Sequence, residues 1–226
     1  ELSNKKFLVF HLKMTGQLIF VDNKGGAVGG GHPTKASQYD LKKISPYTRI
    51  AIDFGNNNKI IFHDMRKFGW VKLMSAVELE TLNLKHGPEP LLKDFSVEYL
   101  TKVLKKSSRA IKAVLLDQKL IAGLGNIYAD EVLHATKVLP GRVAKTIKTD
   151  EIKLLYKNIK KILSKAVAVG GTSFNTFRGL EGELGNYVKH LKVYGRDGQK
   201  CLKCGEKLTK TRLAGRGTVY CKKCQK

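Results

Sequence analysis

The first 200 residues contain no cysteine, so disulfides spread through the fold are excluded, and no secretory signal is apparent. No apolar run approaches the length of a membrane span, and no stretch has the aromatic-faced, basic amphipathicity of an interfacial anchor. Acidic residues are scarce, at 19 against 42 lysines and arginines, which gives a formal net charge of +23. This charge predicts a polyanionic partner, and nucleic acid ranks above the alternatives, an anionic membrane surface or the ribosome.

All four cysteines lie near the end of the sequence, as two Cys-x-x-Cys pairs with sixteen residues between them: Cys201, Cys204, Cys221 and Cys224. Each pair can point two thiolates to one side of a tight turn, and the segment between them can return as a β-hairpin. The spacing predicts one structural zinc ion. Two disulfides are the alternative, which a cytosolic chain disfavours. Without zinc, a hairpin this small should unfold.

Short apolar segments separated by turns predict an antiparallel β-sandwich or barrel in the first part of the chain. The expected strands are 7–12, 17–21, 49–54, 59–62 and 71–74, with a glycine-rich loop at 24–35. A turn signal follows almost directly after Glu1, and we therefore expect the N-terminal part of the sandwich to lie outside this sequence. The first domain is predicted over residues 1–74.

Helical periodicity follows, and we expect a helical domain over 75–190 and a zinc segment over 191–226, beginning with a strand at 191–194. The helix starts are predicted at Ser75, at Ser96, at Ser107 or Ser108, near Asn126 and, for a long helix, at Thr149. Before the fourth helix, Gly123 and Gly125 allow close approach to backbone amides, which is typical of a phosphate-binding loop. A plain glycine-capped connection between helices is the alternative.

Several segments together resemble the formamidopyrimidine-DNA glycosylase (Fpg/Nei) family of bacterial base-excision repair. They are HLKMTG at 11–16, DMRKFG at 64–69, GPEPL at 87–91, KAVLLDQKLIAGLGNIYADEVL at 112–133, VYGR at 193–196 and the four-cysteine hairpin carrying Arg-Gly-Thr at 216–218. The resemblance covers essentially the whole chain in the same order. It implies an α+β fold in which an antiparallel β-sandwich, incomplete at its N-terminus, precedes a helix-two-turn-helix domain and a C-terminal zinc β-hairpin finger.

The resemblance also assigns residues that contact DNA. Lys112 and Asn126 fall where the family grips phosphates around the lesion. Arg216 matches the hairpin arginine that contacts phosphate and has a catalytic role in the second elimination step. Tyr47 occupies a position where a DNA-contacting histidine is common. The region 172–189, a glycine-rich loop, corresponds to the segment that closes over the extruded base.

Met14, Arg66 and Phe68 match the three residues that fill the gap left by that base, with Phe68 as the wedge and Arg66 facing the orphaned partner base. Extruding a base costs a few kcal/mol, which an apolar wedge and an arginine donor can offset. The alternative is that Met14 and Phe68 are core residues of the sandwich and Arg66 is a surface charge.

The resemblance implies a DNA glycosylase with AP lyase activity on oxidised purines such as 8-oxoguanine and formamidopyrimidines. Family enzymes attack the sugar C1′ with an N-terminal proline amine, helped by a glutamate and a lysine. None of these three residues has a counterpart in this sequence, so we expect lesion binding without catalysis. The alternative functions are a noncatalytic protein that binds damaged or abasic DNA and a zinc-ribbon RNA-binding protein. We expect a monomer in the bacterial cytoplasm, associated with the nucleoid.

Overall fold

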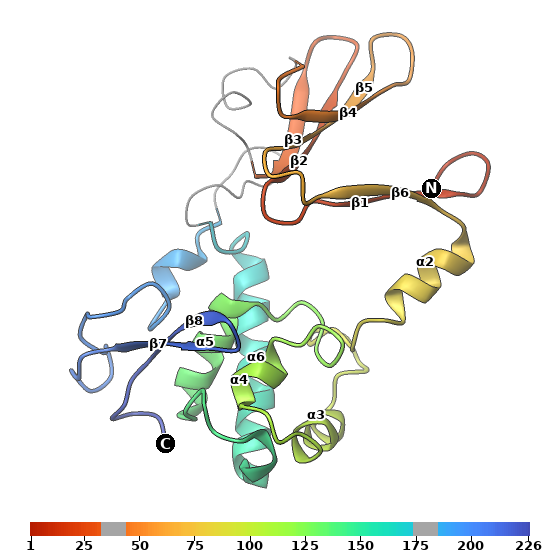
Figure 1. The fold of residues 1–226 in the computed structure, drawn as a ribbon. Helices are drawn as coiled ribbons and strands as arrows, with labels where there is room; N and C mark the ends of the chain where they lie inside the picture. The colour runs from red at the N-terminus through yellow and green to blue at the C-terminus, as the bar shows by residue number, and fades with distance from the viewer. Residues whose placement is uncertain (33–43, 174–184) are drawn as a thin grey trace. The chain divides into compact units, whose positions relative to one another are not determined.

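The computed structural model describes residues 1–32, 44–173 and 185–226 (Figure 1). The chain divides into two compact units, each assembled from two segments of the sequence. The first unit comprises Glu1–Thr81 and Val169–Val188, and the second comprises Leu82–Ala168 and Lys189–Lys226.

The first unit is built on antiparallel sheets, which confirms the predicted β-rich first part. β1 (Phe7–His11) pairs with β6 (Trp70–Met74), and four further strands form a sheet in the order β3-β2-β5-β4. These four are β2 (Gly16–Val21), β3 (Ala27–Gly31), β4 (Thr48–Asp53) and β5 (Lys59–Asp64). Ile19 and Ile61 are register partners with no exposed surface, and the rings of Phe10 and Phe62 meet edge to face across the two sheets.

The predicted glycine-rich loop at 24–35 contains a strand, β3, that the sequence did not predict. β3 runs beside β2 because its glycines permit very close backbone approach. A Cβ on Gly29 would lie 2.8 Å from the Leu18 carbonyl oxygen, and one on Gly31, where φ is +119°, would collide with the Gly16 carbonyl oxygen. Glycine has a low β-propensity, so the sequence did not predict a strand whose glycines allow its backbone to lie close to β2. Residues 33–35 of that loop lie outside the described residues.

The helices of the second unit share one hydrophobic core. They are α3 (Val97–Lys105), α4 (Ile111–Leu115), α5 (Asn126–Thr136) and α6 (Thr149–Ala168), with the 3-10 turn η1 at Ala144–Thr146. Each helix contributes fully buried apolar residues, among them Leu104, Ile111, Leu133 and Ile159. The fourth and fifth predicted helices begin where expected, at Asn126 and Thr149.

Serine caps also open two helices as predicted. α2 (Ala76–Asn83) follows Ser75, whose Oγ accepts from the Glu78 N–H at 3.2 Å while the Ser75 N–H donates to the Glu78 carboxylate at 2.8 Å. In α3, Ser96 Oγ accepts from the Tyr99 N–H at 3.1 Å. All three bonds satisfy backbone groups that a helix start otherwise leaves unpaired.

The third helix does not begin at Ser107 or Ser108, as was predicted, but at Ile111. Ala110 stands at the N-cap position with an extended ψ of 140° and forms an antiparallel bridge with Val143. The Ser107 carbonyl accepts from the Lys145 N–H. Pairing with residues 143–145 thus keeps 107–110 out of the helix, which a local serine signal cannot reveal.

The zinc segment contains the predicted hairpin, formed by β7 (Thr209–Leu213) and β8 (Arg216–Tyr220). The strand predicted at 191–194 is not formed. A 3-10 turn, η2 (Tyr187–His190), precedes these residues, and the N–H groups of 192–194 donate to the Glu131 carboxylate instead of to a neighbouring strand.

The described part of the chain contains no helix with the combination of length and apolarity that crossing a membrane requires.

Candidate nucleic-acid interface

The loop before α5 leaves the backbone N–H groups at the start of this helix uncovered by the described side chains. Gly125 is the N-cap in an extended conformation, and no described side chain caps it. Gly123 has φ +76°, which favours glycine, and a Cβ at either glycine would meet nothing within 4 Å. Gln118 fixes the loop, accepting from the Gly123 N–H at 2.8 Å and donating to the Leu124 carbonyl at 3.0 Å. The helix dipole and the open glycines make this start suited to an anion.

Arg216 lies beside the tip of the β7–β8 hairpin. The tip is a two-residue turn of Ala214 and Gly215, both with positive φ, at +50° and +72°, as a type I′ turn requires. Arg216 is exposed. The carbonyl of the next residue, Gly217, accepts from Asn126 Nδ2 at 3.1 Å. Two residues predicted to bind DNA, Asn126 and Arg216, are thereby brought together within the second unit.

The resemblance assigns Lys112 to a phosphate contact, and the structure shows its side chain inside the protein. Its side chain has no exposed surface. Its ammonium lies 2.6 Å from Asp130 Oδ1, 2.8 Å from Thr218 Oγ1 and 3.0 Å from the Gly217 carbonyl oxygen. These three oxygens equal in number the three donors of an ammonium group. Burial lowers the pKa of Lys112, and the Asp130 carboxylate opposes that shift. In this structure Lys112 connects α4 to the hairpin, and its direct contact with a phosphate stays a prediction.

Two adjacent acids on α5 hold the zinc segment, and sequence reasoning missed both. Asp130 Oδ2 accepts from the Val219 N–H at 3.0 Å, and the Glu131 carboxylate accepts from the N–H groups of 192–194 at 2.8 to 3.0 Å. Burial raises the pKa of Asp130, while Lys112 and the Val219 N–H act in the opposite direction. Their position could have revealed them, since two successive acids between Ala129 and Val132 lie on a face that a helix buries, and buried acids need partners.

In the first unit, Met14, Arg66 and Phe68 lie on two loops that touch each other. Met14 is in the β1–β2 loop, and Arg66 and Phe68 are in the β5–β6 loop. Met14 is 62% exposed and Phe68 is 54% exposed, which excludes the alternative that they are core residues. The Arg66 guanidinium lies 4.6 Å from the centroid of the Phe68 ring, and the Arg66 N–H contacts Thr15 Oγ1 at 3.2 Å.

Tyr47 approaches the same loops through its backbone. Its carbonyl accepts from the Asp64 N–H at 2.9 Å, at the end of β5. Tyr47 thus precedes β4 beside the strand that leads directly into the Arg66 loop. The first unit thus joins the Met14 loop to the Arg66–Phe68 loop through Thr15, and Tyr47 contacts the residue from which the second loop starts.

The four cysteine sulfurs form a compact cluster, with every pair of Sγ atoms within 4.8 Å. Cys204 and Cys221 are 3.5 Å apart and Cys201 and Cys224 are 4.0 Å apart, too far for a disulfide near 2.05 Å. A tetrahedral zinc with Zn–S distances of about 2.3 Å requires sulfurs about 3.8 Å apart, which fits. Burial, followed by hydrogen bonds with the neighbouring thiols, raises the pKa of Cys224 to about 12.

The chain is 42% identical over 227 residues to the formamidopyrimidine-DNA glycosylase of Prochlorococcus marinus strain MIT 9312, an alignment that spans 99% of this chain and 72% of the relative. The chain belongs to the formamidopyrimidine-DNA glycosylase family. The enzyme of that name from Listeria monocytogenes strain EGD-e is 39% identical, over 98% of this chain and 79% of the relative.

Three models of this glycosylase family match successive parts of the chain. The formamidopyrimidine-DNA glycosylase N-terminal domain matches residues 1–71, the formamidopyrimidine-DNA glycosylase H2TH domain matches 86–178, and the zinc finger found in FPG and IleRS matches 198–226. The MutM (Fpg) structure from Thermus thermophilus is 33% identical, with a TM-score of 0.81, and the likeness covers 99% of this chain and 77% of that one. Lactococcus lactis Fpg, solved in complex with DNA containing an abasic site, is 35% identical with a TM-score of 0.80, over 98% of this chain and 75% of that one.

The formamidopyrimidine-DNA glycosylase zinc finger explains the thiol cluster. The match and the sulfur geometry agree on one structural zinc ion, held by Cys201, Cys204, Cys221 and Cys224. The zinc would supply folding energy to the finger, since the cysteines themselves make up part of its small hydrophobic cluster with Val193, Leu208 and Val219.

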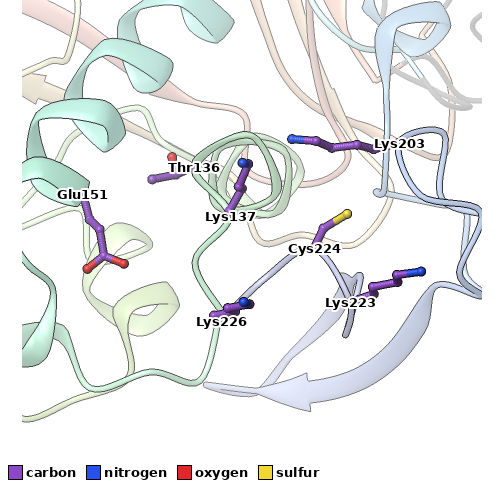
Figure 2. A pocket seen from close by; sticks show the side chains of 7 residues that line it. All are labelled: Thr136, Lys137, Glu151, Lys203, Lys223, Cys224 and Lys226. Carbon is purple, nitrogen blue, oxygen red and sulfur yellow. The ribbon is translucent and has the colours of Figure 1, made fainter.

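A basic cavity of about 470 Å³ lies at the opposite end of α5 from Asn126 (Figure 2). Its lining residues are Thr136, Lys137, Glu151, Lys203, Lys223, Cys224 and Lys226. The Glu151 carboxylate is already bound by Arg142 at 2.6 Å. α5 is about 16 Å long at 1.5 Å per residue, so this family member carries positive charge well beyond the Asn126–Arg216 surface.

The segment that resembles the family's base-covering loop, 172–189, falls largely on residues 174–184, which lie outside the described residues. At its edges, the Gly185 N–H donates to Ser173 Oγ at 2.9 Å, and the Asn186 N–H donates to the Val169 carbonyl at 3.0 Å. These bonds join the two ends of the segment.

Proposed function

We propose that this glycosylase family member binds duplex DNA at damaged or abasic sites in the base-excision repair of oxidised purines such as 8-oxoguanine and formamidopyrimidines. The observation that carries the proposal is the contact between Asn126 and the hairpin backbone next to Arg216. It unites an open helix start and an exposed arginine on one surface. We further propose that the protein acts as a monomer in the bacterial cytoplasm, at the nucleoid.

The second unit would provide most of the affinity, by binding phosphates. The glycine loop offers a helix N-terminus, Asn126 offers an amide and Arg216 offers a guanidinium at the hairpin tip. Lys112, which is buried, acts by holding the hairpin beside α5. The net charge of +23 adds an attraction that is independent of sequence and weakens steeply as salt rises.

The first unit would provide lesion preference, through Met14, Arg66 and Phe68. An extruded base leaves a gap whose unstacking costs a few kcal/mol, and an exposed aromatic wedge recovers part of that cost by stacking. Arg66, beside the Phe68 ring, can donate to the unpaired base opposite. Tyr47 lies near enough to these loops to contribute a further DNA contact.

Two candidate functions differ in whether the protein carries out chemistry on the DNA or only binds it. Glycosylase and AP lyase chemistry needs an amine that forms a Schiff base at the sugar C1′, and Arg216 would then assist the second elimination. We propose that the 226 residues of this sequence carry lesion recognition, through the Asn126–Arg216 surface and the Arg66–Phe68 pair. A noncatalytic protein that binds damaged or abasic sites is the second candidate.

Two measurements test these proposals. Affinity is compared for an abasic-site duplex, an undamaged duplex and single-stranded RNA over a series of salt concentrations. Preference for the abasic duplex is expected, whereas equal affinity for undamaged DNA would refute lesion recognition and equal affinity for RNA would favour a zinc-ribbon RNA-binding protein. Borohydride trapping on an 8-oxoguanine duplex then tests chemistry, since a covalent adduct would show that these residues supply a nucleophile.

A further inference from the structure

The Asp64 carboxylate is the centre of the turn that carries Arg66 and Phe68. Asp64 ends β5 and has no exposed surface. Its Oδ2 accepts from the Gly69 N–H at 2.6 Å, and its Oδ1 accepts from the Arg66 N–H at 3.2 Å. One carboxylate therefore binds backbone at both ends of the 66–69 segment. Its hydrogen bonds fix the direction in which the Arg66 and Phe68 side chains leave the turn.

The same carboxylate reaches the other loop through Thr15. The Thr15 hydroxyl donates to Asp64 Oδ1, and its oxygen also contacts the Arg66 N–H at 3.2 Å. Thr15 directly follows Met14. Side chains separated by about fifty positions in the sequence are thus joined by a hydroxyl that bonds to both the carboxylate and the Arg66 backbone.

Backbone geometry leaves these two loops little alternative. A Cβ on Gly69 would lie 2.7 Å from the Phe62 ring and 3.0 Å from Asp64 Oδ2, and one on Gly16 would collide with the Leu12 backbone. Lys67 holds φ +59°, which is uncommon outside glycine. The turn therefore depends on hydrogen bonds to keep a conformation that its residues do not favour by themselves.

Burial alone would raise the pKa of Asp64, but hydrogen bonds from Thr15 and from backbone N–H groups lower it further than burial raises it. The carboxylate is therefore ionised at neutral pH, and its hydrogen bonds are of the stronger, charge-assisted kind.

We propose that Asp64 and Thr15 are positioning residues that hold the Met14 loop and the Arg66–Phe68 turn together as one preformed wedge, so that the three side chains enter the gap in DNA as a unit. This inference rests on the proposed function. A wedge that is ordered before binding does not lose the entropy of ordering two loops when it enters the duplex. Without the Thr15 bond, Met14 and Phe68 stay exposed, but their two loops are no longer held in a fixed position relative to each other.

The test uses the 226-residue chain with Thr15→Val, which removes the hydroxyl and keeps the shape. Affinity is measured for abasic and undamaged duplexes, and a fluorescent base analogue beside the abasic site reports unstacking when the wedge enters. We expect the preference for abasic over undamaged DNA to fall about tenfold, the size of one lost hydrogen bond to a charged group. Affinity for undamaged DNA and the thermal transition should change little, and Thr15→Ser should restore the preference.

The controls separate positioning from folding and from the proposed function. Thr81→Val removes a hydroxyl on exposed α2, bonded there only within its own helix to the Val77 carbonyl, and should leave the preference unchanged. Asp64→Asn should lower the preference at least as far as Thr15→Val. If Thr15→Val keeps the full wild-type preference for the abasic duplex, the inference is refuted and the proposed function stands. If the wild-type chain itself shows no preference, the proposed function fails instead.

Discussion

Replacing Lys112 with methionine tests whether the buried ion pair with Asp130 holds the second unit together. The change leaves the Asp130 carboxylate buried with the Val219 N–H as its remaining neighbour, and it removes the donor from two hairpin oxygens. Removing one partner of a buried pair typically costs about 3 to 5 kcal/mol. With a urea dependence of about 2 kcal/mol per molar, the unfolding midpoint should fall by about 2 M.

The chain offers separate probes for its two units. Trp70, on β6, is the single tryptophan, so its fluorescence reports the first unit, while far-UV circular dichroism reports chiefly helices α3 to α6 of the second. Lys112→Met should move the dichroism transition and leave the Trp70 transition in place. Lys153→Met, an exposed lysine of α6, is the matched control and should move neither.

The double variant Lys112→Met with Asp130→Asn should be more stable than Lys112→Met alone. Asparagine removes the unpaired charge but keeps an oxygen for the Val219 N–H, so the largest part of the penalty disappears. Wild-type stability of the single variant would refute the assignment of Lys112 as a buried structural residue. Additive losses in the double variant would show that the two side chains are not coupled.

Three further outcomes are expected. Arg216→Ala should weaken abasic-site binding about tenfold, as loss of a charged contact does, with bound zinc unchanged by metal analysis; zinc loss would mark Arg216 as a folding residue. Removing zinc with a chelator should unfold the hairpin, seen as loss of the dispersed amide signals of β7 and β8 in NMR spectra, and should abolish DNA binding through Arg216. Asp64 has a folded-state pKa below its ordinary value, so its stabilising contribution is complete above about pH 4 and lost as pH falls further; the Trp70 transition should show this acid dependence and Asp64→Asn should reduce it.

The sequence predicted the features that depend on local or repeated signals. The four-cysteine cluster followed from spacing, and the serine caps at Ser75 and Ser96 followed from side-chain chemistry that acts within one turn. The candidate DNA-contacting residues came from the resemblance and not from periodicity. Exposure of Met14 and Phe68 agrees with that assignment, although composition alone would have placed both in a core.

The features that were missed depend on partners distant in the sequence. β3 pairs with β2 at Gly29 and Gly31, where a Cβ would meet the β2 backbone at close range. The strand predicted at 191–194 is absent because Glu131 supplies the acceptors that its N–H groups need. The resemblance assigned Lys112 to a phosphate, and local sequence gave no sign that Asp130 and the hairpin surround it. In each case the deciding atom belongs to an element that local sequence does not specify.

The attachment of the zinc finger to α5 limits how it can be engineered. The finger draws two of its anchors from neighbouring positions of one helix, Asp130 and Glu131, and the Gln225 side chain donates to the Val138 carbonyl just after that helix ends. A chimera that exchanges residues 191–226 has to place the backbone N–H groups of 192–194 and 219 where these two buried carboxylates can accept from them. Because Lys112 of α4 also binds Gly217 and Thr218 of the hairpin, the smallest transplantable piece is α4, α5 and the finger, exchanged between relatives together.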